Sequence, residues 1–338
     1  MKKLIIILSL AVTFATATAS ASAEGEKGAS APSSASPVAD CGRAWTAVAN
    51  TTFDQLTDIH AIAYGGGKFV AGGYNKMAYS SDGVTWTAVE KSVWLNGVEA
   101  IAYGGGKFVT GVNYVTGGNN INTIAYSSDG VTWARAANSP FTKSINAVVW
   151  GNGKFLAGGA YGKMAYSSDG VTWTAVKNSP FMDAVVAIVW GGGRFVAAER
   201  GSQIAYSSDG IKWTAVTDIT VGGETILSIA YGSNKYVVVG RYGLLAYSSD
   251  GVTWTKAAKA KTPFGSSDVA DVVYDNNKFI VGAASGKMAY SSDGVTWTAV
   301  KESAFGKTSA ILSIASGGGK FVAVGANGRI AYSEGCLK

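Results

Sequence analysis

The sequence has 338 residues, of which 45 are glycine and only 5 are proline, and charged residues make up 15%. Hydrophobic residues make up 47%, so the composition excludes a collagen and an acidic disordered chain and supplies material for a packed core. The formal net charge of +6 falls by two, to +4, without Lys2 and Lys3, which is too dilute to indicate nucleic acid or an anionic membrane as a partner.

The first 23 residues have the pattern of a secretory signal peptide. Lys2 and Lys3 precede an apolar run from Leu4 to Phe14, and residues 21–23 form an A-x-A cleavage site. Residues 24–40 are rich in Ala, Ser and Pro without periodicity, which predicts a flexible leader. No later apolar run approaches the roughly eighteen residues of a membrane-spanning helix. We therefore expect an exported protein, periplasmic, secreted or on the cell surface, with no transmembrane anchor.

The dominant feature of the chain is an internal repeat of propeller-blade length. The phrase AYSSDG recurs six times, and each copy is followed by a tryptophan, at positions 86, 133, 173, 213, 254 and 297. Each copy contains four short segments that alternate or run apolar, for example 145–150, 154–159, 163–168 and 171–176. Glycine-rich and Ser-Asp-Gly turns join the first segment to the second and the third to the fourth. Each copy thus predicts an antiparallel four-stranded sheet.

The two chain ends predict that these sheets close into a ring. Seven first strands are expected to begin at Ile59, Val98, Ile145, Val185, Ile226, Val269 and Ile311. The chain stops just past the last third strand, at 330–333, and the missing fourth strand is found at 43–48. We therefore predict an all-β fold over residues 41–338, a seven-bladed β-propeller whose last blade is completed by the N-terminal strand.

The two cysteines fall in the one turn that this closure cuts open. When Trp45 is aligned with Trp297 of the sixth copy, Cys41 takes the position of Asp293. Cys336 takes the position of Gly294 in the same turn. A Cys41–Cys336 disulfide would replace the missing turn in an exported protein, and the alternative is two free thiols.

The repeated S-S-D-G-V-T-W resembles the Asp-box (BNR repeat), S-x-D-x-G-x-T-W, of sialidase-like β-propeller proteins, although Asp and Gly are adjacent in this chain. The resemblance covers six of the seven blades and implies that each Asp caps the turn amides while the Trp packs below. The residues concerned are Asp82, Asp129, Asp169, Asp209, Asp250 and Asp293. The alternative is a calcium site, but one carboxylate per turn falls far short of the roughly six to eight oxygens that calcium takes.

The resemblance does not extend to the catalytic residues of sialidases. No F-R-I-P-like segment precedes the first motif, and the framework positions of most arginines leave too few for the three that hold the substrate carboxylate. A glycosidase needs two carboxylates across one bond, whereas most aspartates in this chain lie in turns. His60, the only histidine, is expected in the core, and no His/Cys cluster suits zinc. We expect no catalytic residues, metal or cofactor.

Departures from the repeat mark the surface that can recognise a ligand. In an antiparallel blade the first and third turns share one face, which we call the lower face. The loops between second and third strands share the upper face with the blade-to-blade connections. One upper-face position that is alanine in three copies is Arg200 and Arg241 in two neighbouring blades, beside Glu199 and Tyr242. The arginines could clamp an anionic group, or they are two solvated side chains.

The second blade carries the longest loop on the upper face. Its Tyr114, Asn119 and Asn120, with Trp94 in a nearby connection, suit the apolar face and hydroxyls of a sugar. The alternative is a tolerated surface insertion. We expect a monomeric, non-catalytic recognition module that binds a glycan or a cell-surface protein on the upper face. The alternatives are a glycoside hydrolase of a different layout and a scaffold or assembly factor.

Overall fold

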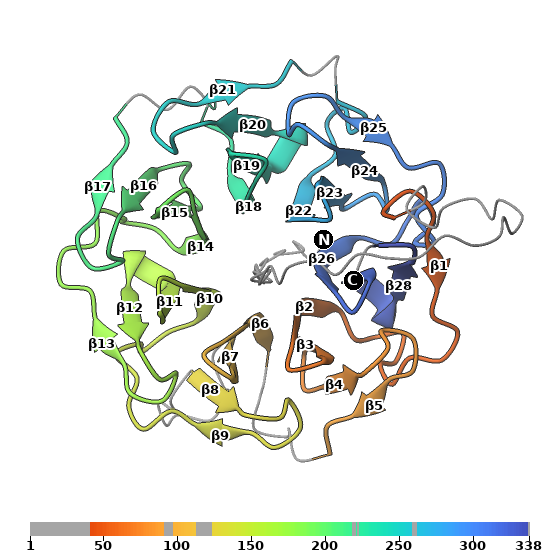
Figure 1. The fold of residues 1–338 in the computed structure, drawn as a ribbon, viewed down its shortest axis with the longest axis horizontal. Helices are drawn as coiled ribbons and strands as arrows, with labels where there is room; N and C mark the ends of the chain where they lie inside the picture. The colour runs from red at the N-terminus through yellow and green to blue at the C-terminus, as the bar shows by residue number, and fades with distance from the viewer. Residues whose placement is uncertain are drawn as a thin grey trace, which may run out of the picture.

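The computed structural model describes residues 41–90, 97–112, 124–217, 221, 223–258 and 262–336. Seven four-stranded antiparallel sheets stand around a central axis (Figure 1), which confirms the seven-bladed propeller. The signal peptide and leader expected within residues 1–40 lie outside the described residues. Within the described part of the chain, no helix is long and apolar enough to cross a membrane.

Each strand has one of four places in its blade, from the central axis outward. The innermost strands are β2 (Ile59–Gly65), β6 (Val98–Gly104), β10 (Ile145–Gly151), β14 (Val185–Gly191), β18 (Ile226–Gly232), β22 (Val269–Asp275) and β26 (Ile311–Gly317). The second strands are β3 (Lys68–Gly73), β7 (Lys107–Val112), β11 (Lys154–Gly159), β15 (Arg194–Glu199), β19 (Lys235–Gly240), β23 (Lys278–Ala283) and β27 (Lys320–Gly325). The third strands are β4 (Met77–Ser80), β8 (Ile124–Ser127), β12 (Met164–Ser167), β16 (Ile204–Ser207), β20 (Leu245–Ser248), β24 (Met288–Ser291) and β28 (Ile330–Ser333). The outermost strands are β5 (Thr87–Ala88), β9 (Ala134–Arg135), β13 (Thr174–Ala175), β17 (Thr214–Ala215), β21 (Thr255–Lys256), β25 (Thr298–Ala299) and β1 (Thr46–Ala47).

The hydrophobic core lies between the blades. In one cluster, Val149 and Leu156 of the third blade pack with Val185 and Phe195 of the fourth, and Phe195 is fully buried. Both faces of each inner sheet are covered in this way, so the strands are apolar almost continuously rather than at alternate positions. A single blade therefore cannot bury its own faces, and the ring is the stable unit.

Close packing between blades explains part of the glycine content. A Cβ atom on Gly104 would lie only 2.0 Å from Cγ of Trp150 in the next blade. On Gly65 it would lie 1.9 Å from Cγ of Tyr103. Glycine at the end of the innermost strand lets an aromatic ring of the neighbour pack directly on the backbone.

The lower-face turns are held by their aspartates. Asp169 Oδ1 accepts hydrogen bonds from the amides of Val171 and Thr172, both at 2.8 Å, and from Ser167 Oγ at 2.9 Å. The Thr172 amide is the largest of the interactions that hold the pKa of Asp169 below its usual value. Two amides are bound in the same way by each of Asp82, Asp129, Asp209, Asp250 and Asp293.

These turns also explain why the outermost strands are short. The sequence predicts a strand over 171–176, but β13 contains only Thr174 and Ala175. The amides at 171 and 172 bind Asp169 and are not available to the sheet. Trp173 follows, 2% exposed, and its indole nitrogen donates to the Gly170 carbonyl at 3.2 Å. The first half of the segment therefore closes the turn instead of pairing with the third strand.

The ring closes as the chain ends predict. Strand β1 pairs antiparallel with β28, with Thr46 opposite Tyr332. Cys41 and Cys336 form a disulfide with their Cα atoms 4.8 Å apart. Both the closure and the disulfide are therefore confirmed.

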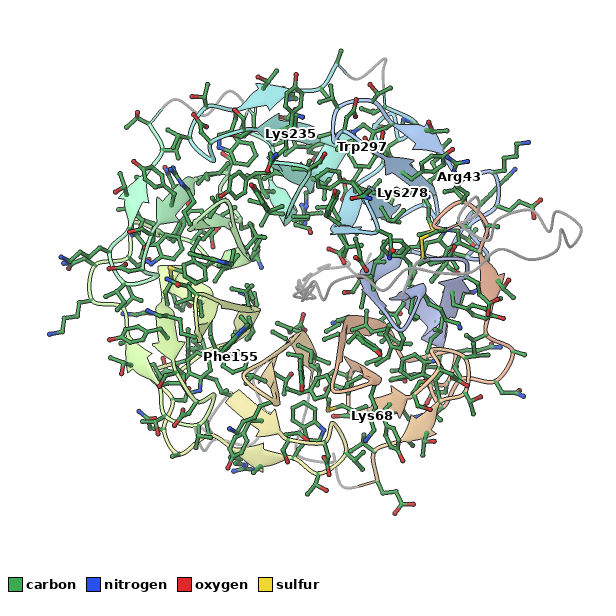
Figure 2. The ribbon with its side chains drawn as sticks, in the orientation of Figure 1. Arg43, Lys68, Phe155, Lys235, Lys278 and Trp297 are labelled. Atoms are coloured by element: carbon green, nitrogen blue, oxygen red, sulfur yellow. A yellow bond between two sulfur atoms is a disulfide. The ribbon has the colours of Figure 1, made fainter. Side chains whose placement is uncertain are left out.

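The split turn keeps three of the hydrogen bonds of the intact ones, although Cys41 has no carboxylate to bind the turn amides. Gly42 N donates to Ser333 Oγ at 2.8 Å, and the indole nitrogen of Trp45 donates to the Gly42 carbonyl at 3.2 Å. Lys278 (Figure 2) donates to the Cys41 carbonyl at 3.1 Å, as Lys154 does to an aspartate carbonyl in an intact turn. Cys41 thus takes the backbone place of the turn aspartate, and the disulfide supplies the missing connection.

Reduction of the closing disulfide should destabilise the whole ring. The bond joins residues 295 apart in sequence. The chain-entropy model gives about 5–6 kcal/mol for so long a loop, as an upper figure. We expect Cys336→Ser to lower the melting temperature by several degrees, measured by calorimetry. An unchanged melting temperature would show that strand pairing alone closes the ring.

Loss of a lower-face turn should cost stability without affecting ligand binding. We expect Asp169→Ala to cost about 1–2 kcal/mol through lost turn hydrogen bonds. Trp173→Ala should cost about 3–5 kcal/mol through a cavity.

The difference in stability between wild type and Asp169→Ala should vanish in acid. The pKa of Asp169 is lowered by folding, so its contribution to stability is present above the unfolded-state pKa and is lost as the pH falls through the folded-state pKa. Denaturant unfolding across pH tests this, and a variant as stable as wild type at neutral pH would contradict it.

Candidate functional site

The large apolar side chains most exposed to solvent gather on the upper face. Among the described residues, six such side chains are exposed, and five of them lie in upper-face loops and connections at 59–96% exposure. They are Leu56, Tyr74, Tyr161, Met182 and Tyr242. The sixth, Ile211, is 37% exposed and lies in a lower-face turn. The upper face is therefore the one that offers apolar contact area.

Two of these tyrosines have a backbone that disfavours their residue type. Tyr161 and Tyr242 lie in the short helical turns η2 (Ala160–Gly162) and η3 (Arg241–Gly243), with φ of 57° and 55°. The equivalent turn η5 (Ala326–Gly328) has Asn327 at this position, with φ of 62°. Asparagine tolerates this left-handed region well, whereas a bulky residue is strained there. The fold does not require tyrosine at this position.

Arg200 and Arg241 occupy equivalent positions on neighbouring blades, as the sequence comparison indicates. Their amides donate to the carbonyls of Ala184 and Thr225, both at 2.9 Å. Both residues are partly buried, and neither forms a salt bridge with another described residue. The hypothesis that they clamp an anionic group stays a prediction.

Glu199 has a structural partner that the sequence does not reveal. Its Oε2 accepts hydrogen bonds from the amides of Met182 and Asp183, at 2.8 and 2.9 Å. The carboxylate therefore fixes the connection between the third and fourth blades. The amide of Tyr242 is bound in a comparable way by Asp268 Oδ1 at 2.9 Å.

Other upper-face carboxylates also bind backbone amides. Asp58 Oδ1 accepts from Asn327 N at 3.0 Å, and Asp54 Oδ1 accepts from Leu56 N at 3.0 Å. Such carboxylates order loops. No group of three or more His, Cys, Asp or Glu side chains that could hold a metal ion occurs within the described ranges. The remaining candidates from sequence, Trp94, Tyr114, Asn119 and Asn120, lie outside the described residues.

The only histidine pairs with a carboxylate of the next blade. His60 Nδ1 lies 3.3 Å from Glu99 Oε1, and both residues are the second residue of an innermost strand. Their side chains are 22% and 2% exposed. Burial alone would lower the pKa of His60, but the hydrogen bond and charge of Glu99, with the charge of Asp58, outweigh it and raise that pKa.

The pairing predicts a measurable shift in the titration of His60. We expect its pKa to lie above the ordinary value in wild type and to fall in Glu99→Gln, where burial acts without the opposing charge. The stability that the pair contributes is present below the unfolded-state pKa and is lost as the pH rises through the folded-state value. NMR titration of the untagged protein reports on this single imidazole. An unchanged pKa in Glu99→Gln would rule out Glu99 as the cause.

Comparisons with known proteins find structures that share the fold. No known family model matches the sequence, and no curated protein matches it. The structure resembles YCF48 from Cyanidioschyzon merolae, with 16% identity and a TM-score of 0.64 over 86% of this chain and 98% of that one. It also resembles YCF48 bound to D1 peptide, with 16% identity and a TM-score of 0.65 over 86% and 95%. A catalytically inactive variant of virginiamycin B lyase from Staphylococcus aureus with quinupristin has 11% identity and a TM-score of 0.71 over 86% and 99%. At such identities these likenesses show the fold alone.

Proposed function

We propose that this protein is an exported, non-catalytic recognition module that binds a protein partner on its upper face. The observation that carries the proposal is that five of the six exposed large apolar side chains in the described chain, Tyr161 and Tyr242 among them, lie in upper-face loops and connections. Tyrosine is enriched at protein interfaces because it supplies a large, rigid contact area with a polar tip. A strained tyrosine where asparagine would suffice fits a role outside folding.

Two further observations support parts of this proposal. The Cys41–Cys336 disulfide suits an oxidising compartment and hence export. One structural neighbour of the same fold has been solved with a peptide bound, which makes a protein partner a better starting point than a glycan. A glycoside hydrolase has less support, because Asp58, Glu199 and Asp268 are engaged by backbone amides.

The proposal predicts that the two strained tyrosines act in binding and not in stability. We expect Tyr161→Asn/Tyr242→Asn to melt at or slightly above the wild-type temperature, because asparagine relieves the left-handed strain. The same variant should bind the best peptide from a random display library at least about tenfold more weakly, since two aromatic anchors are lost. Calorimetric titration gives both affinities.

A lower-face control separates recognition on the upper face from nonspecific hydrophobic binding. Ile211→Ala removes an exposed apolar side chain from a lower-face turn, and peptide affinity should stay within about twofold. The same protein is screened in parallel on a glycan array. Equal loss in the two variants, no loss in the tyrosine variant, or binding of glycans but of no peptide would each contradict a protein partner on the upper face.

A further inference from the structure

A large cavity opens between the sixth and seventh blades on the upper-face side. Its volume is about 780 Å³, within the usual range for ligand sites. Its walls come from the start of β24, the segment after β25, the connection to β26 and the residue before β28. Met288 and Val300 supply apolar wall, and Ala304 lines it with a left-handed backbone, φ 63°.

The charge of this cavity is strongly one-sided. Four cationic side chains line it, Lys287, Lys301, Lys307 and Arg329, against the single acidic side chain of Glu302. None of the four forms a salt bridge with another described residue. Arg329 Nη1 donates to the Phe305 carbonyl at 3.1 Å, which ties the guanidinium to the connecting loop. An excess of cationic over acidic side chains around one cavity favours an anionic ligand.

The repeat provides an internal reference for this cavity. The third blade has the same sequence around its third and fourth strands, and Lys163 and Lys177 stand where the sixth blade has Lys287 and Lys301. Three other lining positions differ in charge, and at the first of them Asn178 stands where the cavity has Glu302. Asp183 stands where the connection has Lys307. Gln203 of the fourth blade stands where the seventh has Arg329.

The same comparison shows differences in size. Ser285 stands where the third blade has the exposed Tyr161, and Gly306 where it has Met182. The space between the sixth and seventh blades is therefore lined by smaller side chains as well as by additional cations. Both changes concern loop residues that the sheets do not need.

A second cavity of about 630 Å³ adjoins the first, because Ala304 and Arg329 line both. Its other lining residues are all uncharged, and half of them are polar, among them Asn50, Gln55 and Asn327. Side-chain amides of this kind can pair with the N–H and C=O groups of an extended peptide. The lining residues of the cationic cavity, all within the described chain, contain no aromatic side chain on which a sugar ring could stack.

We propose that these two cavities bind an acidic segment of a peptide, with its carboxylates on Lys287, Lys301, Lys307 and Arg329 and its backbone along the neutral cavity. The proposal rests on the proposed function, since it names the chemistry of one part of the partner. Lysine and arginine supply charge-assisted hydrogen bonds to carboxylates, and the attraction weakens as salt screens it.

The test uses a fluorescein-labelled peptide with four consecutive glutamates, a matched peptide with four glutamines, and the full chain. We expect the glutamate peptide to bind with an affinity that falls with salt, and the glutamine peptide not to bind. Lys307→Asp/Arg329→Gln should weaken the glutamate peptide by at least about tenfold. Both substitutions copy what the third and fourth blades already carry, so the melting temperature should change little, although the Arg329 to Phe305 hydrogen bond is lost.

Lys163→Gln/Lys177→Asp is the matched control, because it also lowers the net charge by three, at the third-blade counterparts of Lys287 and Lys301. We expect affinity within about twofold of wild type. Equal loss in this control would show general charge attraction and overturn the proposal. Loss in Arg200→Ala/Arg241→Ala, with none in Lys307→Asp/Arg329→Gln, would move the anion site to the fourth and fifth blades and overturn it as well.

Two further outcomes decide between kinds of ligand and between the two proposals. Tighter binding of an oligogalacturonate, lost in Lys307→Asp/Arg329→Gln, would assign the cavity to an acidic glycan and overturn the peptide. The display-selected peptide separates the proposals. If its binding depends on Tyr161 and Tyr242 but no acidic peptide binds the cavity, recognition on the upper face stands and this inference fails.

Discussion

Each blade of this protein has two apolar faces, and only its neighbours can cover them. Val149 and Leu156 of one blade share a buried cluster with Val185 and Phe195 of the next, and this arrangement repeats around the ring. An open end would expose such a face to water, at a cost of about 25 cal/mol per Å². Closure is therefore the constraint on which every blade depends. The pairing of β1 with β28 and the disulfide beside it meet that constraint.

Closure also divides the surface into two faces with different freedom. The lower face holds the turn aspartates, the tryptophans beneath them and the lysines that reach the next turn, so its residues are fixed by structure. The upper face holds loops that must only connect strands. Tyr161, Tyr242, Lys307 and Arg329 all lie there, at positions where other copies carry different residues. The residues of this face can therefore vary, and with them the ligand that is recognised, without affecting the closure of the ring.

The sequence predicts most of the framework because the same strand and turn patterns recur in every copy of the repeat. All seven innermost strands begin where the copies indicate, and both cysteines lie in the turn that closure cuts. The third strand of the third blade begins at Met164, one residue later than expected, since Lys163 still belongs to the loop, as the Gly159 N to Lys163 O bond shows.

The candidate sites are harder to predict from the sequence than the framework. Glu199 looks like a partner for Arg200, but its carboxylate binds amides sixteen and seventeen positions earlier in the chain. The cationic cavity draws on three separate segments, 285–288, 300–307 and Arg329, so no single stretch of sequence contains it. Lys307 differs in charge from its counterpart Asp183, which is a signal that only a comparison of the blade-to-blade connections contains. Tyr161 lies one position beyond Ala160, the residue that aligns with Arg200.

Hydrogen–deuterium exchange on the complex with the display-selected peptide tests the central claim most directly. The claim is that recognition uses the upper face, where the copies differ, and leaves the lower face free. We predict slower exchange in the segments around 160–163, 241–244 and 301–309 and unchanged exchange in the turns at 82–85 and 169–172. Protection confined to those lower-face turns would contradict the account.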